Sequence, residues 1–104
     1  MIRKAFKMIL KEGCKEEYKK RHDEIWPELV KTLEEAGVSD YAIYLDEDTN
    51  ILFATQKVKD HNTSDLLPQN PVVQRWWKMM SEVMETNPDK SPVSIDLTEM
   101  FYMD

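Results

Sequence analysis

Residues 2–10 alternate in a way that separates their apolar side chains onto two faces of an extended chain. Phe6, Met8 and Leu10 fall on one face, and Ala5 and Ile9 fall on the other. A period of two is typical of a β-strand that turns one face toward a core. We therefore expect a first strand over 2–10.

Two later runs, 38–46 and 51–59, are rich in β-branched and aromatic residues and flank the polar stretch 47–50. Such runs with a short polar connection predict an antiparallel hairpin. A last strand is expected over 93–102. Both hairpin strands carry apolar side chains on both faces, with Ala42, Tyr44 and Leu52 or Ala54 expected on one face and Tyr41, Ile43, Ile51 and Phe53 on the other.

Over 15–36 the apolar period lengthens to that of a helix, which Gly37 is expected to end. Pro27 interrupts this stretch. Because proline lacks an amide donor, it either kinks one helix after Trp26 or begins a second helix as its first residue. The apolar face is expected to contain Tyr18, His22, Ile25, Leu29, Val30, Leu33 and Ala36.

A second helical stretch follows the polar segment 60–70, which contains Pro68 and is expected to be a loop or a broken helical turn. Asn70 is a suitable N-cap, and Pro71 is a suitable first helical residue. The polar stretch 87–92 is expected to end this helix. Its apolar positions recur at helical spacing: Val73, Trp76 or Trp77, Met80, Val83 and Met84.

The predicted order of elements, βαββαβ, is typical of the ferredoxin-like α+β sandwich, in which two helices cover one face of a four-stranded antiparallel sheet. With 104 residues, of which 41% are hydrophobic, residues 1–104 form one domain with a single modest core. The second sheet face would expose a large apolar area in a monomer. We therefore expect a second copy of the chain or a ligand to cover it.

Charge and composition exclude several classes of partner. The net charge is −6, and the longest basic run is Lys19-Lys20-Arg21, so a nucleic acid is not expected. No stretch has the length of a membrane span, and Lys7 and Lys11 interrupt any secretory signal. The single Cys14 allows no intrachain disulfide. These features predict a cytoplasmic protein that binds no membrane.

Neither a cofactor nor a metal is expected. With two glycines in the chain there is no Gly-rich phosphate loop. His22 and His61 have no further His, Cys or carboxylate partners at the spacing of a ligand set. The thiol of Cys14 is not expected to act in catalysis, and His61 is expected to lie in the polar segment 60–70.

The adjacent Trp76 and Trp77 cannot both lie in one buried stripe, because neighbouring helical residues point about 100° apart. Indole faces suit the apolar surface of a sugar or another small ring, and the indole N–H can bond a hydroxyl. The plainer alternative is that Trp76 fills the core and Trp77 packs against an edge or a partner. Tyr18 and His22, one helical turn apart, favour a site, since imidazole exchanges protons near neutral pH.

The chain closely resembles L-rhamnose mutarotases in four successive segments: 18–29 (YKKRHDEIWPEL), 41–45 (YAIYL), 75–78 (RWWK) and 87–92 (NPDKSP). The resemblance extends through nearly the whole chain and is weakest over 60–70. It implies a cofactor-free enzyme that interconverts the α and β anomers of L-rhamnose, and a homodimer whose sheets pack face to face as a dimeric α/β barrel. It further implies that His22 is the proton donor and that four side chains contact the sugar: Tyr18, Tyr41, Trp76 and Trp77.

Two other functions remain compatible with the residues. A cofactor-independent monooxygenase of the same dimeric architecture would take an apolar aromatic substrate, and a non-catalytic module would bind a small molecule or only dimerise. The sequence also leaves open which base complements His22, how strictly the site excludes related sugars, and whether Trp76 or Trp77 anchors the helix. Substrate identity therefore rests on the resemblance.

Overall fold

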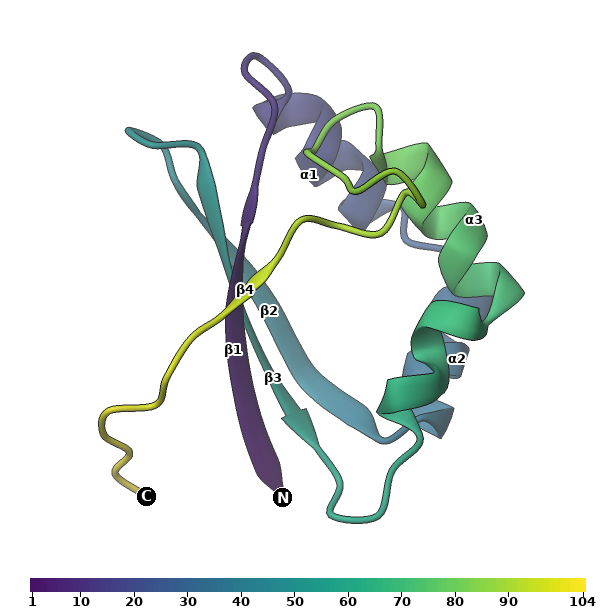
Figure 1. The fold of residues 1–104 in the computed structure, drawn as a ribbon, viewed down its shortest axis with the longest axis vertical. Helices are drawn as coiled ribbons and strands as arrows, with labels where there is room; N and C mark the ends of the chain where they lie inside the picture. The colour runs from purple at the N-terminus through teal and green to yellow at the C-terminus, as the bar shows by residue number, and fades with distance from the viewer.

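The structure, a computed structural model, describes all residues from Met1 to Asp104. Its four strands form one antiparallel sheet in the order β2-β3-β1-β4, which confirms the predicted ferredoxin-like α+β fold. The helices gather on one face of this sheet (Figure 1). The elements in chain order are β1 (Ile2–Ile9), α1 (Lys15–Asp23), α2 (Pro27–Glu35), β2 (Val38–Asp46), β3 (Ile51–Val58), the 3₁₀ helix η1 (Ser64–Gln69), α3 (Pro71–Met80) and β4 (Ile95–Asp96).

Pro27 begins a new helix, the second of the two predicted outcomes. It is the first residue of α2, and Trp26 before it is extended, with φ −65° and ψ 129°. The residue before a proline disfavours the α conformation, so α1 ends before Trp26 and the chain changes direction there. No helix of the structure has the length and apolar composition that crossing a bilayer requires.

Helix α3 begins as predicted but ends earlier than predicted. The Asn70 side chain accepts a hydrogen bond from the backbone N–H of Val72 at 2.8 Å, and Pro71 follows the cap. The prediction that Val83 and Met84 are helical is wrong, because α3 ends at Met80. Both side chains are nevertheless buried in the core.

The segment after α3 leaves the helical path because its backbone pairs with the end of β1. Lys11 donates its N–H to the carbonyl of Val83 at 3.0 Å, and Glu85 donates to Ile9 at 2.9 Å. Met84 forms an isolated bridge with Leu10. These backbone bonds take the place of another helical turn while the apolar side chains still reach the core.

The predicted last strand over 93–102 is also largely wrong, since β4 contains only two residues. Leu97 donates its N–H to Ala5, but the chain beyond it is held mainly by the side chain of Arg3. The Arg3 guanidinium donates to Glu99 at 2.8 Å and lies 3.4 Å from the ring centre of Tyr102. The C-terminal segment thus runs away from β4 on the side of the sheet opposite the helices (Figure 1).

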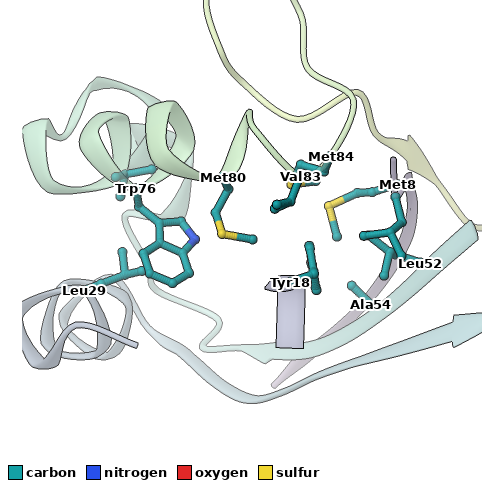
Figure 2. Close-up of a cluster of buried hydrophobic side chains, with 11 residues drawn as sticks. Met8, Tyr18, Leu29, Leu52, Ala54, Trp76, Met80, Val83 and Met84 are labelled. Atoms are coloured by element: carbon teal, nitrogen blue, oxygen red, sulfur yellow. The ribbon is translucent and has the colours of Figure 1, made fainter. Parts of the chain in front are cut away.

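The core fills the layer between the sheet and the helices. Figure 2 shows side chains from β1, β3 and the three helices directed toward one another in this layer. Aliphatic, methionine and aromatic groups pack together without a buried polar atom lacking a partner. The cluster consists of Met8, Leu10, Tyr18, Leu29, Leu52, Ala54, Val73, Trp76, Met80, Val83 and Met84.

The hairpin register corrects the predicted grouping of faces. Ile43 pairs with Ala54, so both face the helices, whereas Tyr44 pairs with Phe53 on the other face. The alternation within each strand was predicted correctly, but alternation does not determine which residues lie opposite one another. The face away from the helices is called the open face below.

A β-bulge lies near the start of β2. Ser39 pairs with Lys57 and Ala42 pairs with Thr55, so the two residues between Ser39 and Ala42 lie opposite a single residue of β3. Asp40, the first of these two, has φ 47°, a left-handed conformation that Asp tolerates better than most residues. The extra residue shifts the alternation of β2, so that Val38 before the bulge and Tyr41 after it, three residues apart, both lie on the helix-covered face.

Candidate active site

A cavity of ≈ 700 Å³ lies between the helix-covered sheet face and the helices. Most of the residues that line it are apolar. All five residues that the sequence analysis proposed for the site line this one cavity: Tyr18 and His22 from α1, Tyr41 from β2, and Trp76 and Trp77 from α3. The fold therefore brings together residues that are up to 59 positions apart in the sequence, from Tyr18 to Trp77.

Tyr18 and His22 form a stacked pair on α1. Residues four apart lie on the same helical face, and here the two ring centroids are 4.5 Å apart with an interplanar angle of 28°. Tyr18 is the only buried residue of α1. Its packing into the core consequently fixes the face of α1 that carries His22.

The imidazole of His22 is oriented by its own helix. Nδ1 lies 3.1 Å from the backbone oxygen of Tyr18, so Nδ1–H donates to this carbonyl and Nε2 is the free nitrogen. Burial lowers the pKa of His22 below its ordinary value, although the bond to Tyr18 and the charge of Asp23 partly oppose this effect. A lowered pKa favours the neutral imidazole and makes the protonated form a stronger acid.

The two indoles have different environments, which identifies the structural anchor of α3. Trp76 is only 8% exposed and belongs to the core cluster. Its ring lies edge to face with His22, at 5.3 Å and 89°, and with Trp26, at 5.2 Å and 86°. Trp77 is half-buried and packs against this cluster from outside. Trp76 is therefore the anchor, while both indoles line the cavity.

Tyr41 reaches the cavity from the sheet, and the bulge in β2 lets it share the helix-covered face with Val38. Its ring packs at an angle of 67° against Phe6 of β1, with centroids 6.3 Å apart. Although 41% of its surface is exposed, burial around the hydroxyl raises the pKa of Tyr41 to about 12. Burial, and secondarily the nearby Tyr41, also raise the pKa of Tyr18. Both hydroxyls therefore stay protonated at neutral pH.

Several polar atoms at the cavity have no hydrogen-bond partner within the chain. They are the hydroxyls of Tyr18 and Tyr41, Nε2 of His22 and the N–H of Trp76. Polar groups in a largely apolar cavity need partners, or their desolvation is costly. A ligand that carries several hydroxyl groups and an apolar surface matches this arrangement.

Other residues that could carry chemistry lie apart from this arrangement. His61 is exposed in the segment before η1, and Cys14 is the half-buried N-cap of α1. No three side chains of His, Cys, Asp or Glu come together as a group that could hold a metal. The cavity lining includes three carboxylate residues, Asp23, Glu34 and Asp40. Asp23 is bonded to Lys19 at 3.0 Å, and Asp40 lies 3.3 Å from the ammonium of Lys57.

Two residues beside the site were not singled out in the sequence analysis. Phe6 supports the ring of Tyr41, and only the register between the strands could have indicated this contact. Arg21 contacts the end of α3 through its guanidinium. The only feature of the sequence that could have drawn attention to Arg21 is its position next to His22. An arginine on a short polar helix is ordinarily exposed, so the sequence alone does not predict its contact with α3.

Comparisons with known proteins agree with the family resemblance noted in the sequence. The family model for L-rhamnose mutarotase matches residues 3–103. The L-rhamnose mutarotase of Phocaeicola vulgatus is 58% identical over 104 residues and covers 100% of both chains. That of Mesorhizobium japonicum is 60% identical over 99 residues, which cover 95% of this chain and 94% of the relative. A crystal structure of the L-rhamnose mutarotase from Formosa agariphila matches with a TM-score of 0.93 and 51% identity over 100% of both chains. The chain therefore belongs to the L-rhamnose mutarotase family.

Proposed function

We propose that this protein is an L-rhamnose mutarotase, an isomerase that interconverts the α and β anomers of L-rhamnose. Family membership over nearly the whole chain supports this function. The structural observation that carries it is the cavity in which an imidazole, two phenols and two indoles meet. Their unpaired polar atoms match the hydroxyl groups of a sugar, and their rings match its C–H surfaces.

Mutarotation requires two proton transfers and no redox change. A base takes the proton of the anomeric hydroxyl, an acid protonates the ring oxygen, and the bond between the ring oxygen and the anomeric carbon breaks. The open-chain aldehyde then rotates about the bond next to the carbonyl carbon and closes on its other face. The enzyme accelerates opening and closure by holding the acid and the base within hydrogen-bond reach of the sugar.

His22 is the proposed acid. Its Nδ1–H is committed to the Tyr18 carbonyl, so the free Nε2 is the atom that carries the exchangeable proton toward the cavity. Because burial lowers its pKa, the protonated imidazole gives up its proton to the ring oxygen more readily than an exposed one would. After the transfer, the neutral ring keeps its orientation through the same Nδ1–H bond.

The tyrosines are proposed to bind the sugar as neutral hydroxyls. With the pKa of Tyr41 raised to about 12 and that of Tyr18 also raised, neither is an available phenolate base near pH 7. We therefore propose a carboxylate or a water molecule, rather than a tyrosine, as the base that complements His22. Trp76 and Trp77 supply stacking surface to the closed and open forms of the sugar alike, which is binding rather than chemistry.

The function is tested by NMR exchange spectroscopy on a panel of reducing sugars. Transfer of magnetisation between the anomers of L-rhamnose, faster with the protein than without it, is expected. Binding without exchange would instead identify a non-catalytic binding module. No response to any sugar, together with oxygen consumption on an apolar aromatic compound, would identify a monooxygenase.

We further propose that the protein is a homodimer joined through the open faces of two sheets. The open face and the segment after β4 carry apolar side chains that nothing in the chain covers. Exposed apolar side chains gathered on one sheet face are uncommon on a monomer and suit a symmetric contact between two copies. The exposed apolar residues are Ile9, Tyr44, Ile95, Leu97, Met100, Phe101 and Met103.

A further inference from the structure

Arg21 occupies the junction between α1 and the C-terminal end of α3. Its Nη1 donates to the backbone oxygen of Met79 at 2.7 Å and lies 2.8 Å from a carboxylate oxygen of Glu82. Its Nε donates to Glu17 at 2.8 Å. Only 19% of the side chain is exposed, which is unusual for an arginine on a surface helix. One guanidinium is thus engaged by acceptors from its own helix and from the end of α3.

Helix α1 has few other means of holding its position. It contains nine residues, of which only Tyr18 is buried, and a helix of this length is not stable in isolation. An exposed ion pair would contribute little, but the Arg21 side chain is only 19% exposed, and its contacts are multiple and charge-assisted. The Met79 carbonyl also lies at the negative end of the α3 dipole, where a cation is favoured.

The junction lies next to the proposed catalytic pair. Arg21 directly precedes His22 in α1, and Met79 lies three residues after Trp76 in α3. The edge-to-face contact of His22 with Trp76 therefore joins the same two helices as the guanidinium does. A shift of α1 along or away from α3 would change the distance between the imidazole and both indoles.

We propose that Arg21 is a positioning residue, whose guanidinium ties α1 to the end of α3 and so holds the His22 imidazole at the correct distance from the sugar-binding indoles. This inference rests on the proposed function only in so far as His22 and the indoles act on the same sugar. Acid catalysis requires a heavy-atom distance of about 2.6–3.2 Å to the accepting atom. A displacement of about 1 Å can lower a rate by about 100-fold.

Arg21→Ala and Arg21→Lys test this role, and Arg75→Ala is the matched control. Arg75 also joins two helices, since it bonds to Glu28 of α2 at 3.3 Å, but its side chain is 60% exposed. The turnover number and KM for L-rhamnose are measured at a temperature at which each variant is fully folded. We expect turnover to fall at least about tenfold in Arg21→Ala, with a smaller change in KM. Arg21→Lys should recover little, because an ammonium cannot reproduce the planar set of donors. Arg75→Ala should retain the parental turnover.

A titration of His22 by NMR without sugar gives a second readout that does not need activity. Arg21→Lys keeps the positive charge, so any change in the His22 pKa reports a change in its surroundings. Loosening of α1 admits water and should raise that pKa toward its ordinary value, whereas Arg75→Ala should leave it at the parental value. Should Arg21→Ala not fold, the Lys variant carries both measurements.

The outcomes separate the two proposals. If the folded Arg21 variants keep the parental turnover and the parental pKa of His22, Arg21 has a purely stabilising role. A lower unfolding temperature in these variants would not change that conclusion. Absence of L-rhamnose exchange in the unmodified protein would overturn the proposed function, while the titration would still decide the role of Arg21.

Discussion

The imidazole of His22 meets the indole of Trp76 edge to face, with ring centroids 5.3 Å apart. One of these residues is the proposed acid and the other is a buried part of the core that anchors α3. The site and the core therefore share a side chain. Changes in the core next to α3 should reach the chemistry, and stability and turnover have to be measured together to separate the two effects.

Replacing His22 with alanine should lower the rate of anomer exchange by about 10² to 10⁴, because a positioned proton donor contributes a factor of this size. His61→Ala is the control, since His61 is exposed and lies outside the cavity lining. Both rates are measured by NMR exchange, with circular dichroism to confirm folding. Equal losses in the two variants, or no loss in His22→Ala, would contradict the assignment.

The lowered pKa of His22 predicts a specific dependence of stability on pH. In the unfolded chain His22 has its ordinary pKa of about 6.5. Between that value and the lower pKa of the folded state, the unfolded chain binds more protons, so the free energy of unfolding should fall as the pH decreases through this window. Above it, the contribution of His22 is fully present.

Urea unfolding at pH 7.5, 6.5 and 5.5 should therefore show a smaller loss of stability in His22→Gln than in the unmodified protein. His61→Gln serves as the control because that side chain is exposed. If the unmodified protein and His22→Gln lose the same amount of stability toward pH 5.5, burial does not disfavour the charged imidazole.

The two tryptophans should respond differently to truncation. Trp76→Ala should destabilise the fold by about 3–5 kcal/mol, as expected for a large buried aromatic side chain, and also weaken sugar binding. Trp77→Ala should cost less stability and act mainly on KM, since stacking serves the closed and open sugar alike. Titration of L-rhamnose into each variant alongside thermal unfolding tests this. If the folded fraction of both variants binds L-rhamnose with the parental affinity, the two indoles do not stack on the sugar.

The proposed dimer predicts that a charge on the open face separates the subunits. Tyr44 is 65% exposed within one chain, so Tyr44→Lys should leave the monomer folded but place two buried cations in a symmetric contact. Leu66→Lys, at an exposed apolar residue of η1, is the control. Sedimentation at micromolar concentration should give twice the chain mass of 12.3 kDa for the parent and the control. A parent that sediments as a single chain would refute the dimer.

Local patterns predicted the elements that local interactions determine. The alternation of 2–10, the polar turn between the hairpin strands, and Asn70 followed by Pro71 all act within a few residues. The end of α3 and the length of β4 depend on distant partners instead. Val83 and Met84 continue a helical pattern, but backbone bonds to Ile9 and Lys11 decide their conformation.

Residue type and helical spacing singled out Trp76, Trp77, Tyr18 and His22 as candidates, and the resemblance supplied their roles and added Tyr41. Their arrangement required the fold. The spacing of residues along the sequence does not predict that Phe6 contacts Tyr41, or that Trp76 rather than Trp77 is buried. Both depend on how β1, β2 and α3 are placed relative to one another. The role of Arg21 was missed for the same reason.

The bulge in β2 has a consequence for how this protein can change. Val38 and Tyr41 lie on opposite sides of the extra residue. Val38 is buried in the core, and Tyr41 lines the cavity. Removing a single residue between them would reverse the orientation of one half of the strand, so that either the core would lose Val38 or the cavity would lose Tyr41. Side chains here can be exchanged one at a time, but the number of residues between Val38 and Ile43 cannot vary without a loss from the core or from the cavity lining.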